Sequence, residues 1–346
     1  MRLLILGGSG MLGHQLWRGL HAQHDTWVTL RRPVADFAAH NLFDEAKAIQ
    51  FDDITDDTAL ERALGQAKPE AVINCVGIIK QRDEASDEAL TLRVNAEFPH
   101  RLAKRCGYGA LCMRASQVGV QSPPEIVEAA ADCLAEAGLA VSMVTGDFDT
   151  VYNNDNGPSA LTNITPYLDL AKRLGAPRIR VALKQESDIA HARRAADEAA
   201  ELGIQLVHQC HTLSLFETVE SIERTLSAID RPNFGLVYEP ANLEICGQDY
   251  GQATIERLAK WIFNVYLQNQ LLKPDGALML PTWCTGDVSF DLIPIHAPGG
   301  GDFGWVFAGL KAVGYDGAVT VHQSAQPGET PEESASGTAD FLRGLI

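Results

Sequence analysis

The sequence has no apolar run as long as a membrane span, and it has few basic residues for its length. Its 346 residues include 28 Lys and Arg against 45 Asp and Glu, which gives a formal net charge of −17. A surface of that sign repels a nucleic-acid backbone. Residues 1–6, which precede the first glycines, are too short for a signal peptide. We therefore expect a cytoplasmic protein with no nucleic-acid partner and no membrane partner.

Paired cysteines are also missing. The seven cysteines contain no Cys-x-x-Cys pair, and their number is odd. This pattern argues against a disulfide framework and against a zinc knuckle, and it favours reduced thiols packed inside the fold. With 46% apolar residues the chain can build substantial cores, and its length suits two domains or one large α/β barrel with an addition.

A glycine-rich loop follows the apolar residues 3–6. It comprises Gly7, Gly8, Ser9, Gly10, Met11, Leu12 and Gly13, and the glycines at 8, 10 and 13 fit G-x-G-x-x-G. Glycine permits a sharp turn and lets backbone N–H groups approach a pyrophosphate, which a Cβ atom would block. Leucines at 12, 16 and 20 then indicate a helix that packs on a sheet. This order favours a dinucleotide site over a plain glycine-rich turn.

Two arginines end the next expected strand, at residues 27–30. Arg31 and Arg32 stand where an acidic residue would bind the ribose 2′-hydroxyl of NAD, and arginines there suit the 2′-phosphate of NADP. The alternative is that both side chains simply lie in solvent at the strand end. Residues 71–76 form a continuous apolar run, as in a buried parallel strand, and residues 88–105 have a helical pattern.

Residues 1–105 resemble the first part of an extended short-chain dehydrogenase/reductase, closest to the dTDP-4-dehydrorhamnose reductase and NAD-dependent epimerase group. The resemblance implies that the glycine loop lines the cofactor site, together with Asp53, Ile54, Asn74, Gly77 and Asn95. That family's proton donor is a Tyr with Lys four residues later, and none of the seven tyrosines here has that spacing. We therefore expect binding of NADP without Tyr–Lys reductase chemistry, and an NADP-dependent nucleotide-sugar reductase or epimerase remains an alternative.

The remaining sequence alternates strands and helices at intervals of roughly 30 residues. Strands are expected at 110–114, 140–145, 178–183, 205–209, 234–239, 262–267 and 318–322, and helices between them at 124–137, 189–201 and 215–229. A parallel sheet with outer helices and this length suit a (β/α)8-type TIM barrel. Seven units are visible where a closed barrel needs eight.

Polar residues gather at the carboxyl ends of these strands, where barrels build their sites. They include Arg114, Lys184, His208, Gln209, His211, Glu239, Asn242, Tyr266, Gln268 and His322. A single polar residue at a strand end more often satisfies a structural hydrogen bond. Several on one rim favour a site. His208 and His211 are three residues apart on one strand and do not automatically share a face.

Residues 107–340 resemble the xylose-isomerase-like family of sugar phosphate isomerases and epimerases. The resemblance rests on Leu174-Gly175-Ala176, Gly203-Ile204 and Gly314-Tyr315-Asp316-Gly317, each before an expected strand. In that family Glu, Asp, His and Glu on four successive strand ends hold a divalent ion, and a carboxylate moves the substrate proton. The matching positions here read Gln209, Glu239, Tyr266 and His322. Only Glu239 keeps an anionic oxygen, and Tyr266 is a poor neutral ligand.

Two interpretations follow from that departure. In the first, Glu239, His211, His322 and Gln209 form a rebuilt site for Zn, Mn or Fe. In the second, metal binding is lost and the pocket binds a sugar without turnover. Lys184 and Arg114 suit a phosphate or carboxylate, with solvated rim charges as the alternative. Residues 298–302 are a glycine-rich loop that either cradles a phosphate through its N–H groups or is simply flexible.

The chain as a whole is expected to be α/β, with a truncated Rossmann-like part at 1–106 joined to a TIM barrel at 107–346 that lacks its own first βα unit. We predict that strand 71–76 fills this gap by pairing with strand 110–114. The leading function is a sugar or sugar-phosphate isomerase or epimerase, with Glu239, His211 and Lys184 as catalytic residues. A non-catalytic dinucleotide or sugar-binding protein is the remaining alternative, and a homo-oligomer is left open.

Overall fold

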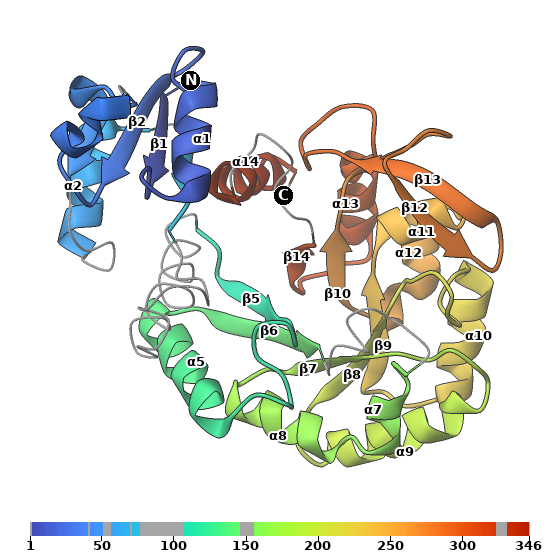
Figure 1. The fold of residues 1–346 in the computed structure, drawn as a ribbon. Coiled ribbons are helices and arrows are strands. Elements are labelled where there is room, and N and C mark those ends of the chain that lie inside the picture. Colours follow the sequence, from blue (N-terminus) through green and yellow to red (C-terminus); the bar gives the residue numbers. More distant parts are fainter. Residues whose placement is uncertain are drawn as a thin grey trace. The chain divides into compact units, whose positions relative to one another are not determined.

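The computed structural model describes residues 2–40, 42–50, 57–69, 71–76, 107–145, 156–322 and 331–345. The chain divides into two compact units (Figure 1). The first comprises Met1–Tyr108 with Ser324–Asp340, and the second comprises Gly109–Gln323 with Phe341–Ile346. The boundary expected between residues 106 and 107 stays a prediction. Among the described helices, none is long and apolar enough to cross a membrane.

The first unit is built on a parallel four-stranded sheet in the order β3-β2-β1-β4. Leu4 and Leu6 pack on one face with Leu60, and Ile5 and Val28 pack on the other face with Trp17. Helices therefore cover both faces, as in a doubly wound fold. The strands are β1 (Arg2–Leu6), β2 (Asp25–Leu30), β3 (Ala48–Gln50) and β4 (Ala71–Asn74), and the helices are α1 (Met11–Leu20), α2 (Asp57–Ala67), η1 (Val34–His40) and η2 (Glu45–Lys47).

The prediction that strand 71–76 completes the barrel is wrong. β4 pairs in parallel with β1, in a register that joins Leu3 to Ala71 and Leu6 to Asn74. Its apolar side chains are already covered there, because Ile73 is buried with Ile5 and Trp17, and Val72 packs against the opposite cluster. The buried run is therefore satisfied within the first unit, as an edge strand of its sheet.

The second unit contains a curved, nearly closed sheet of seven parallel strands among the described residues, in the order β14-β10-β9-β8-β7-β6-β5. The strands are β5 (Ala110–Met113), β6 (Ala140–Thr145), β7 (Arg178–Val181), β8 (Gln205–Gln209), β9 (Phe234–Tyr238), β10 (Ile262–Leu267) and β14 (Val319–Val321). All seven lie where the sequence predicts them. Because β5 and β14 are the two edges, no strand of the described residues fills the eighth position.

Helices line the outer side of this curved sheet (Figure 1). They are α5 (Pro124–Ala137), α7 (Ser159–Thr162), α8 (Thr165–Arg173), α9 (Asp188–Ala200), α10 (Val219–Ile229), α11 (Pro240–Ile245), α12 (Gln252–Leu258), η5 (Ala259–Trp261) and α13 (Phe303–Ala312). The last helix, α14 (Pro331–Arg343), belongs to the first unit as far as Asp340. Met143, Val207, Val237 and Tyr266 form a buried cluster contributed by four of the strands. The strands therefore end at one shared rim above a packed core.

An antiparallel sheet that the sequence analysis did not predict lies between β10 and α13. Its strands β11 (Gln270–Leu272), β12 (Leu278–Thr282) and β13 (Gly286–Leu292) pair in the order β11-β13-β12. We call residues 270–292 the insertion sheet. Its strands are short, and several large apolar side chains on it are exposed, including Met279 and Trp283. Without a buried face along every strand, its alternation of apolar and polar residues is weak.

Candidate functional site

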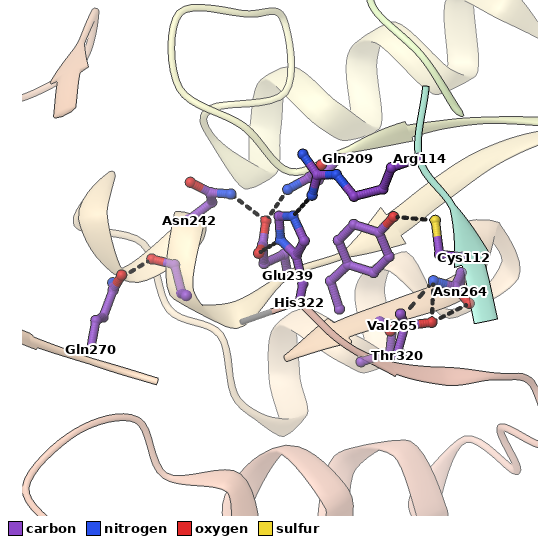
Figure 2. A network of polar contacts seen from close by, with 12 residues as sticks. Cys112, Arg114, Gln209, Glu239, Asn242, Asn264, Val265, Gln270, Thr320 and His322 are labelled. Carbon is purple, nitrogen blue, oxygen red and sulfur yellow. Dashed lines mark hydrogen bonds and ion pairs between the residues drawn. The ribbon is translucent and has the colours of Figure 1, made fainter. Parts of the chain in front are cut away.

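Glu239 is the centre of a polar cluster at the rim of the seven-stranded sheet (Figure 2). It directly follows β9, and Pro240 begins α11 after it, so the strand ends and the chain turns at this residue. The Glu239 side chain is only 1% exposed. Its Oε2 accepts hydrogen bonds from the side-chain amides of Gln209 and Asn242, and its Oε1 accepts one from His322 Nδ1 at 3.0 Å. These donors compensate a carboxylate that would otherwise be costly to bury.

His322 connects Glu239 to Arg114. Its Nε2 lies 2.9 Å from an Arg114 guanidinium nitrogen. Since a guanidinium only donates, Nε2 is the acceptor and the ring hydrogen is on Nδ1, where it is donated to Glu239. The imidazole also packs on the Tyr266 ring, with centroids 4.5 Å apart. Arg114 follows β5 and His322 follows β14, so this hydrogen bond joins the two edge strands of the sheet at their carboxyl ends.

Burial and hydrogen bonding set the charges of this cluster. Burial alone would raise the pKa of Glu239, but the hydrogen bonds from His322 and Gln209 outweigh it and hold this pKa below its ordinary value. Glu239 is therefore a carboxylate at neutral pH. Burial lowers the pKa of His211 to about 4, so His211 is neutral. The His211 Nδ1 lies 3.0 Å from the Thr212 carbonyl, which leaves Nε2 as the acceptor.

Two of the predicted rim residues have other surroundings. His208 is 1% exposed, stacks on Phe216 with ring centroids 3.9 Å apart, and has its pKa lowered to about 3 by burial. It is a neutral core residue. Lys184 holds its ammonium 6.0 Å from the centre of the Trp283 ring, and its backbone N–H donates to Asp188 at 2.8 Å. Lys184 therefore faces the insertion sheet at the outer part of the rim.

The expected metal position at Tyr266 is occupied by a neutral core residue. Tyr266 is 1% exposed, and burial raises the pKa of its phenol well above the ordinary value. Its hydroxyl lies 3.2 Å from Cys112 Sγ. A phenol that stays protonated is a poor ligand for a divalent ion.

The structure brings Glu239, Gln209 and His322 together, and His211 follows the same strand as Gln209. In this arrangement both nitrogens of His322 are engaged, and Gln209 directs its amide N–H at Glu239. Among the described residues, Gln209 Oε1 is buried without a hydrogen-bond partner. An ion held by His322 would have to displace either Arg114 from Nε2 or Glu239 from Nδ1, so these donors do not fit a metal as they stand. Metal ligation here stays a prediction.

A buried arginine, Arg180, is a site residue that the sequence analysis missed. It lies on β7 and is 3% exposed. Its positive charge lowers the pKa of His211 and also acts to lower the pKa of Tyr266, so Arg180 lies near both side chains. A charged residue inside an apolar strand is the signal that could have found it. Together with Arg114 it makes the interior of the rim favourable for an anion.

The glycine-rich loop at residues 298–302 does not form a phosphate cradle. The Gly301 N–H donates to Asn269 Oδ1 at 3.0 Å, and the Asp302 N–H donates to the Tyr250 hydroxyl at 3.3 Å. The Asp302 carboxylate accepts from Trp305 N at 2.8 Å and caps α13. The N–H groups of Gly301 and Asp302 are therefore occupied, and a fixed negative charge already stands at the start of this helix.

The glycine loop of the first unit has the geometry of an anion-binding turn. Gly7 has a φ of +77°, and a Cβ atom on Gly13 would lie 2.3 Å from the Gly7 carbonyl oxygen. The Gly8 N–H donates to the Thr29 carbonyl at 2.9 Å, which fixes the loop to β2. Gly10 is the N-cap of α1 and provides no side-chain cap, so the helix N-terminus is open to an anion.

The other predicted cofactor residues lie partly at the same edge. Arg31 and Arg32 are exposed and directly follow β2, and Asn74 ends β4 beside Leu6 in the sheet register. Arg32 lies 3.9 Å from Asp36 and 5.1 Å from the centre of the Phe37 ring. Parallel β1, β2 and β4 thus bring the loop, the arginines and Asn74 to one edge. Asp53, Ile54, Gly77 and Asn95 lie outside the described residues.

Comparison with known proteins identifies the class to which this fold and rim belong. Residues 100–345 match the profile of the xylose isomerase-like TIM barrel family. The chain belongs to this family. Among solved structures, a xylose isomerase domain protein from Planctomyces limnophilus has a TM-score of 0.57 at 15% identity, with 71% of this chain and 90% of that chain covered. D-Allulose 3-epimerase from Methylomonas sp. has a TM-score of 0.52 at 17% identity, with 72% and 92% covered.

The N-terminal part has different relatives. Residues 3–133 match the NAD dependent epimerase/dehydratase family, which overlaps the barrel match over residues 100–133. A dTDP-4-dehydrorhamnose reductase from Streptomyces griseus is 30% identical over 116 residues, which are 33% of this chain and 33% of the reductase. The chain spans about a third of the length of the curated relatives it matches. Both resemblances found in the sequence are confirmed, and the barrel family agrees with the expectation of an enzyme.

Proposed function

We propose that the second unit is a sugar or sugar-phosphate isomerase or epimerase that moves a proton through the Glu239–His322 pair. The observation that carries this proposal is the chain of hydrogen bonds from a buried Glu239 carboxylate through His322 to the Arg114 guanidinium. The family of the barrel and its epimerase-like structural neighbours support the same reaction class. The neighbours show the fold alone, so the reaction rests on these residues.

The roles follow from burial. The Glu239 side chain is 1% exposed, whereas the His322 side chain is 24% exposed, so His322 is the member of the pair that a substrate can reach. Glu239 fixes the Nδ1–H tautomer and stabilises the imidazolium that forms when Nε2 accepts a proton. Arg114 then hydrogen-bonds to the substrate oxygen, where negative charge develops as the C–H proton beside a carbonyl leaves. In an isomerase His322 returns the proton to the neighbouring carbon on the same face, while the hydroxyl proton of that carbon moves to the former carbonyl oxygen. An epimerase needs in addition a second acid on the opposite face.

Two further residues suit the rest of a sugar. Neutral His211 can accept a hydrogen bond from a hydroxyl, and Lys184 at the outer rim suits a phosphate. A divalent ion would supply polarisation of the substrate carbonyl and hydroxyl, but the hydrogen bonds of His322 and Gln209 do not fit one as they stand. None of the steps above passes through an ion.

The proposal is tested by steady-state kinetics on a panel of D-fructose, D-allulose, D-xylulose and their phosphates. We expect Glu239→Gln to lower kcat by roughly 10²- to 10⁴-fold, as for loss of general acid–base catalysis. Glu186→Gln is the matched control, because Glu186 is an exposed rim carboxylate paired with Arg224 at 3.4 Å. Equal turnover by wild type and Glu239→Gln on a substrate from the panel would overturn the proposal.

We also propose that the first unit binds NADPH without reducing a substrate through a Tyr–Lys pair. The open N-terminus of α1, the glycines around it and the arginines after β2 support this binding. Titration of NADPH and NADH, followed by protein fluorescence, tests it. We expect NADPH to bind more tightly, and a clear preference for NADH would contradict the role of Arg31 and Arg32.

A further inference from the structure

A second group of metal-ligating side chains lies outside the Glu239 cluster. Glu217, Cys246 and Cys284 offer a carboxylate oxygen and two sulfurs that all lie within 4.8 Å of one another. They come from three separate segments of the second unit. Glu217 precedes α10, Cys246 is the C-cap of α11, and Cys284 is in the turn between β12 and β13.

The Glu217 carboxylate is held in place by backbone donors. It is 4% exposed. Its Oε1 accepts from Leu213 N at 2.6 Å and from Trp283 N at 2.8 Å, and its Oε2 accepts from Cys284 N at 3.1 Å. The Trp283 N–H is shared between both oxygens, at 3.0 Å from Oε2. The three donors therefore make four contacts, and a cation on Oε2 would take the place of the longer, shared contact while the Trp283 N–H stays on Oε1. Metal-binding carboxylates are commonly oriented by such hydrogen bonds.

The two thiols complete the group. Cys246 is 1% exposed and Cys284 is exposed, so one sulfur is embedded and the other faces solvent. The Cys284 sulfur lies 3.6 Å from the Cys246 carbonyl oxygen. Burial raises the pKa of the Cys246 thiol, and the neighbouring Cys284 and Glu217 raise it further. Glu217, Cys246 and Cys284 all become negative when they ionise, and none of these three side chains supplies a positive charge.

We propose that Glu217, Cys246 and Cys284 bind one zinc ion, with water in the fourth position. Two thiolates and a carboxylate suit zinc, whereas magnesium and calcium prefer oxygen ligands alone. Binding releases the two thiol protons to solvent. The exposed Cys284 provides the path of entry. The ion links the turn between β12 and β13 to the end of α11. Because α11 begins directly after Glu239, this link makes the outer rim more rigid.

A disulfide between the same cysteines is the competing outcome. Both outcomes require thiolates, but a disulfide leaves the Glu217 carboxylate beside the two sulfurs without a cation, whereas a divalent ion offsets the negative charge of all three groups, so the structure favours the metal. Neither outcome can be predicted from the sequence, because the three residues are far apart along the chain and form no spaced motif.

The proposal is tested by titrating Co²⁺ into the full chain after reduction, since thiolate ligands give Co²⁺ a charge-transfer absorption in the near ultraviolet. We expect one Co²⁺ per chain with this absorption, and Zn²⁺ to abolish it by displacement. Cys284→Ser should remove the absorption. Cys112→Ser is the matched control and should retain it, because Cys112 contacts Tyr266 in the barrel interior. Glu239→Gln should also retain it, which separates this site from the proposed catalytic one.

Zn²⁺ should also raise the Tm of the wild type but not that of Cys284→Ser. The proposal is overturned if the reduced wild type shows no thiolate absorption, or if Cys284→Ser shows it unchanged. It is likewise overturned if protein purified without reductant carries a Cys246–Cys284 disulfide in its peptide map. Circular dichroism of Cys284→Ser, whose altered side chain is exposed, verifies that the variant is folded.

Discussion

The hydrogen bond between Arg114 and His322 should stabilise the open sheet of the second unit. β5 and β14 are its two edges and have no strand between them among the described residues. The Arg114–His322 contact of 2.9 Å joins their carboxyl ends. We predict that Arg114→Gln destabilises the second unit, because the change removes a charged donor and leaves His322 Nε2 without its partner.

The expected size follows from the chemistry of the contact. Hydrogen bonds that involve a charged group contribute about 1.5–3 kcal/mol. The His322 side chain is 24% exposed, so water replaces part of the lost bond and the lower half of this range applies. We therefore expect Arg114→Gln to cost about 1.5–2 kcal/mol of unfolding free energy. Backbone amides of β5 and β14 should exchange faster with solvent, whereas those of the central strand β8 should change less.

Urea unfolding together with hydrogen exchange measures both effects. Arg224→Gln is the matched control, because Arg224 pairs with Glu186 at 3.4 Å and both side chains are more than half exposed. Exposed ion pairs contribute about 0–1 kcal/mol. If Arg114→Gln were no more destabilising than Arg224→Gln, or if exchange at β5 and β14 stayed unchanged, the contact would not hold the sheet edges together.

Three further predictions concern other parts of the chain. Gly13→Ala should abolish NADPH binding and destabilise the first unit by roughly 1–3 kcal/mol, because its Cβ would lie 2.3 Å from the Gly7 carbonyl oxygen, whereas Gly19→Ala, with open space around it, should do neither. His322→Gln should lower kcat. Its Tm should lie within a few degrees of the Tm of Arg114→Gln, because both variants lose the same hydrogen bond. Equal kcat values for His322→Gln and wild type would exclude His322 as the proton carrier. Lowering the pH should destabilise the second unit through His208, whose pKa is lowered to about 3 in the folded state. The stability that the neutral His208 contributes is complete above its unfolded-state pKa of about 6.5 and is lost as the pH falls toward 3. His208→Phe should therefore flatten the dependence of the urea midpoint on pH between 7 and 5.

Much of the barrel follows from local sequence patterns. β6, β9 and β10 occupy largely apolar stretches that the sequence predicts as strands, since buried parallel strands are mostly apolar. The position of Glu239 after β9 follows from the same reasoning. The glycine loop also behaves as its spacing predicts, because a Cβ atom at Gly13 cannot fit.

Other features depend on contacts between distant residues and leave no local pattern. The partner of β4 is one example, because a buried strand does not encode which sheet it joins. The insertion sheet is another, since its pairing is set by contacts such as those of Glu217 with the turn at Trp283. The link from Glu239 through His322 to Arg114 joins residues 83 and 208 positions apart. The sequence could place these residues on one rim, but it could not show which nitrogen of His322 faces which partner.

The central claim is that the Glu239–His322 pair moves a substrate proton, and solvent isotope exchange tests it most directly. Each sugar of the panel is incubated in D2O with wild type, Glu239→Gln or the Glu186→Gln control, and deuterium at the carbon beside the carbonyl is measured by NMR. We predict deuterium incorporation with wild type and Glu186→Gln, and a loss of at least roughly 10²-fold in its rate with Glu239→Gln. Incorporation at the wild-type rate by Glu239→Gln would contradict the account.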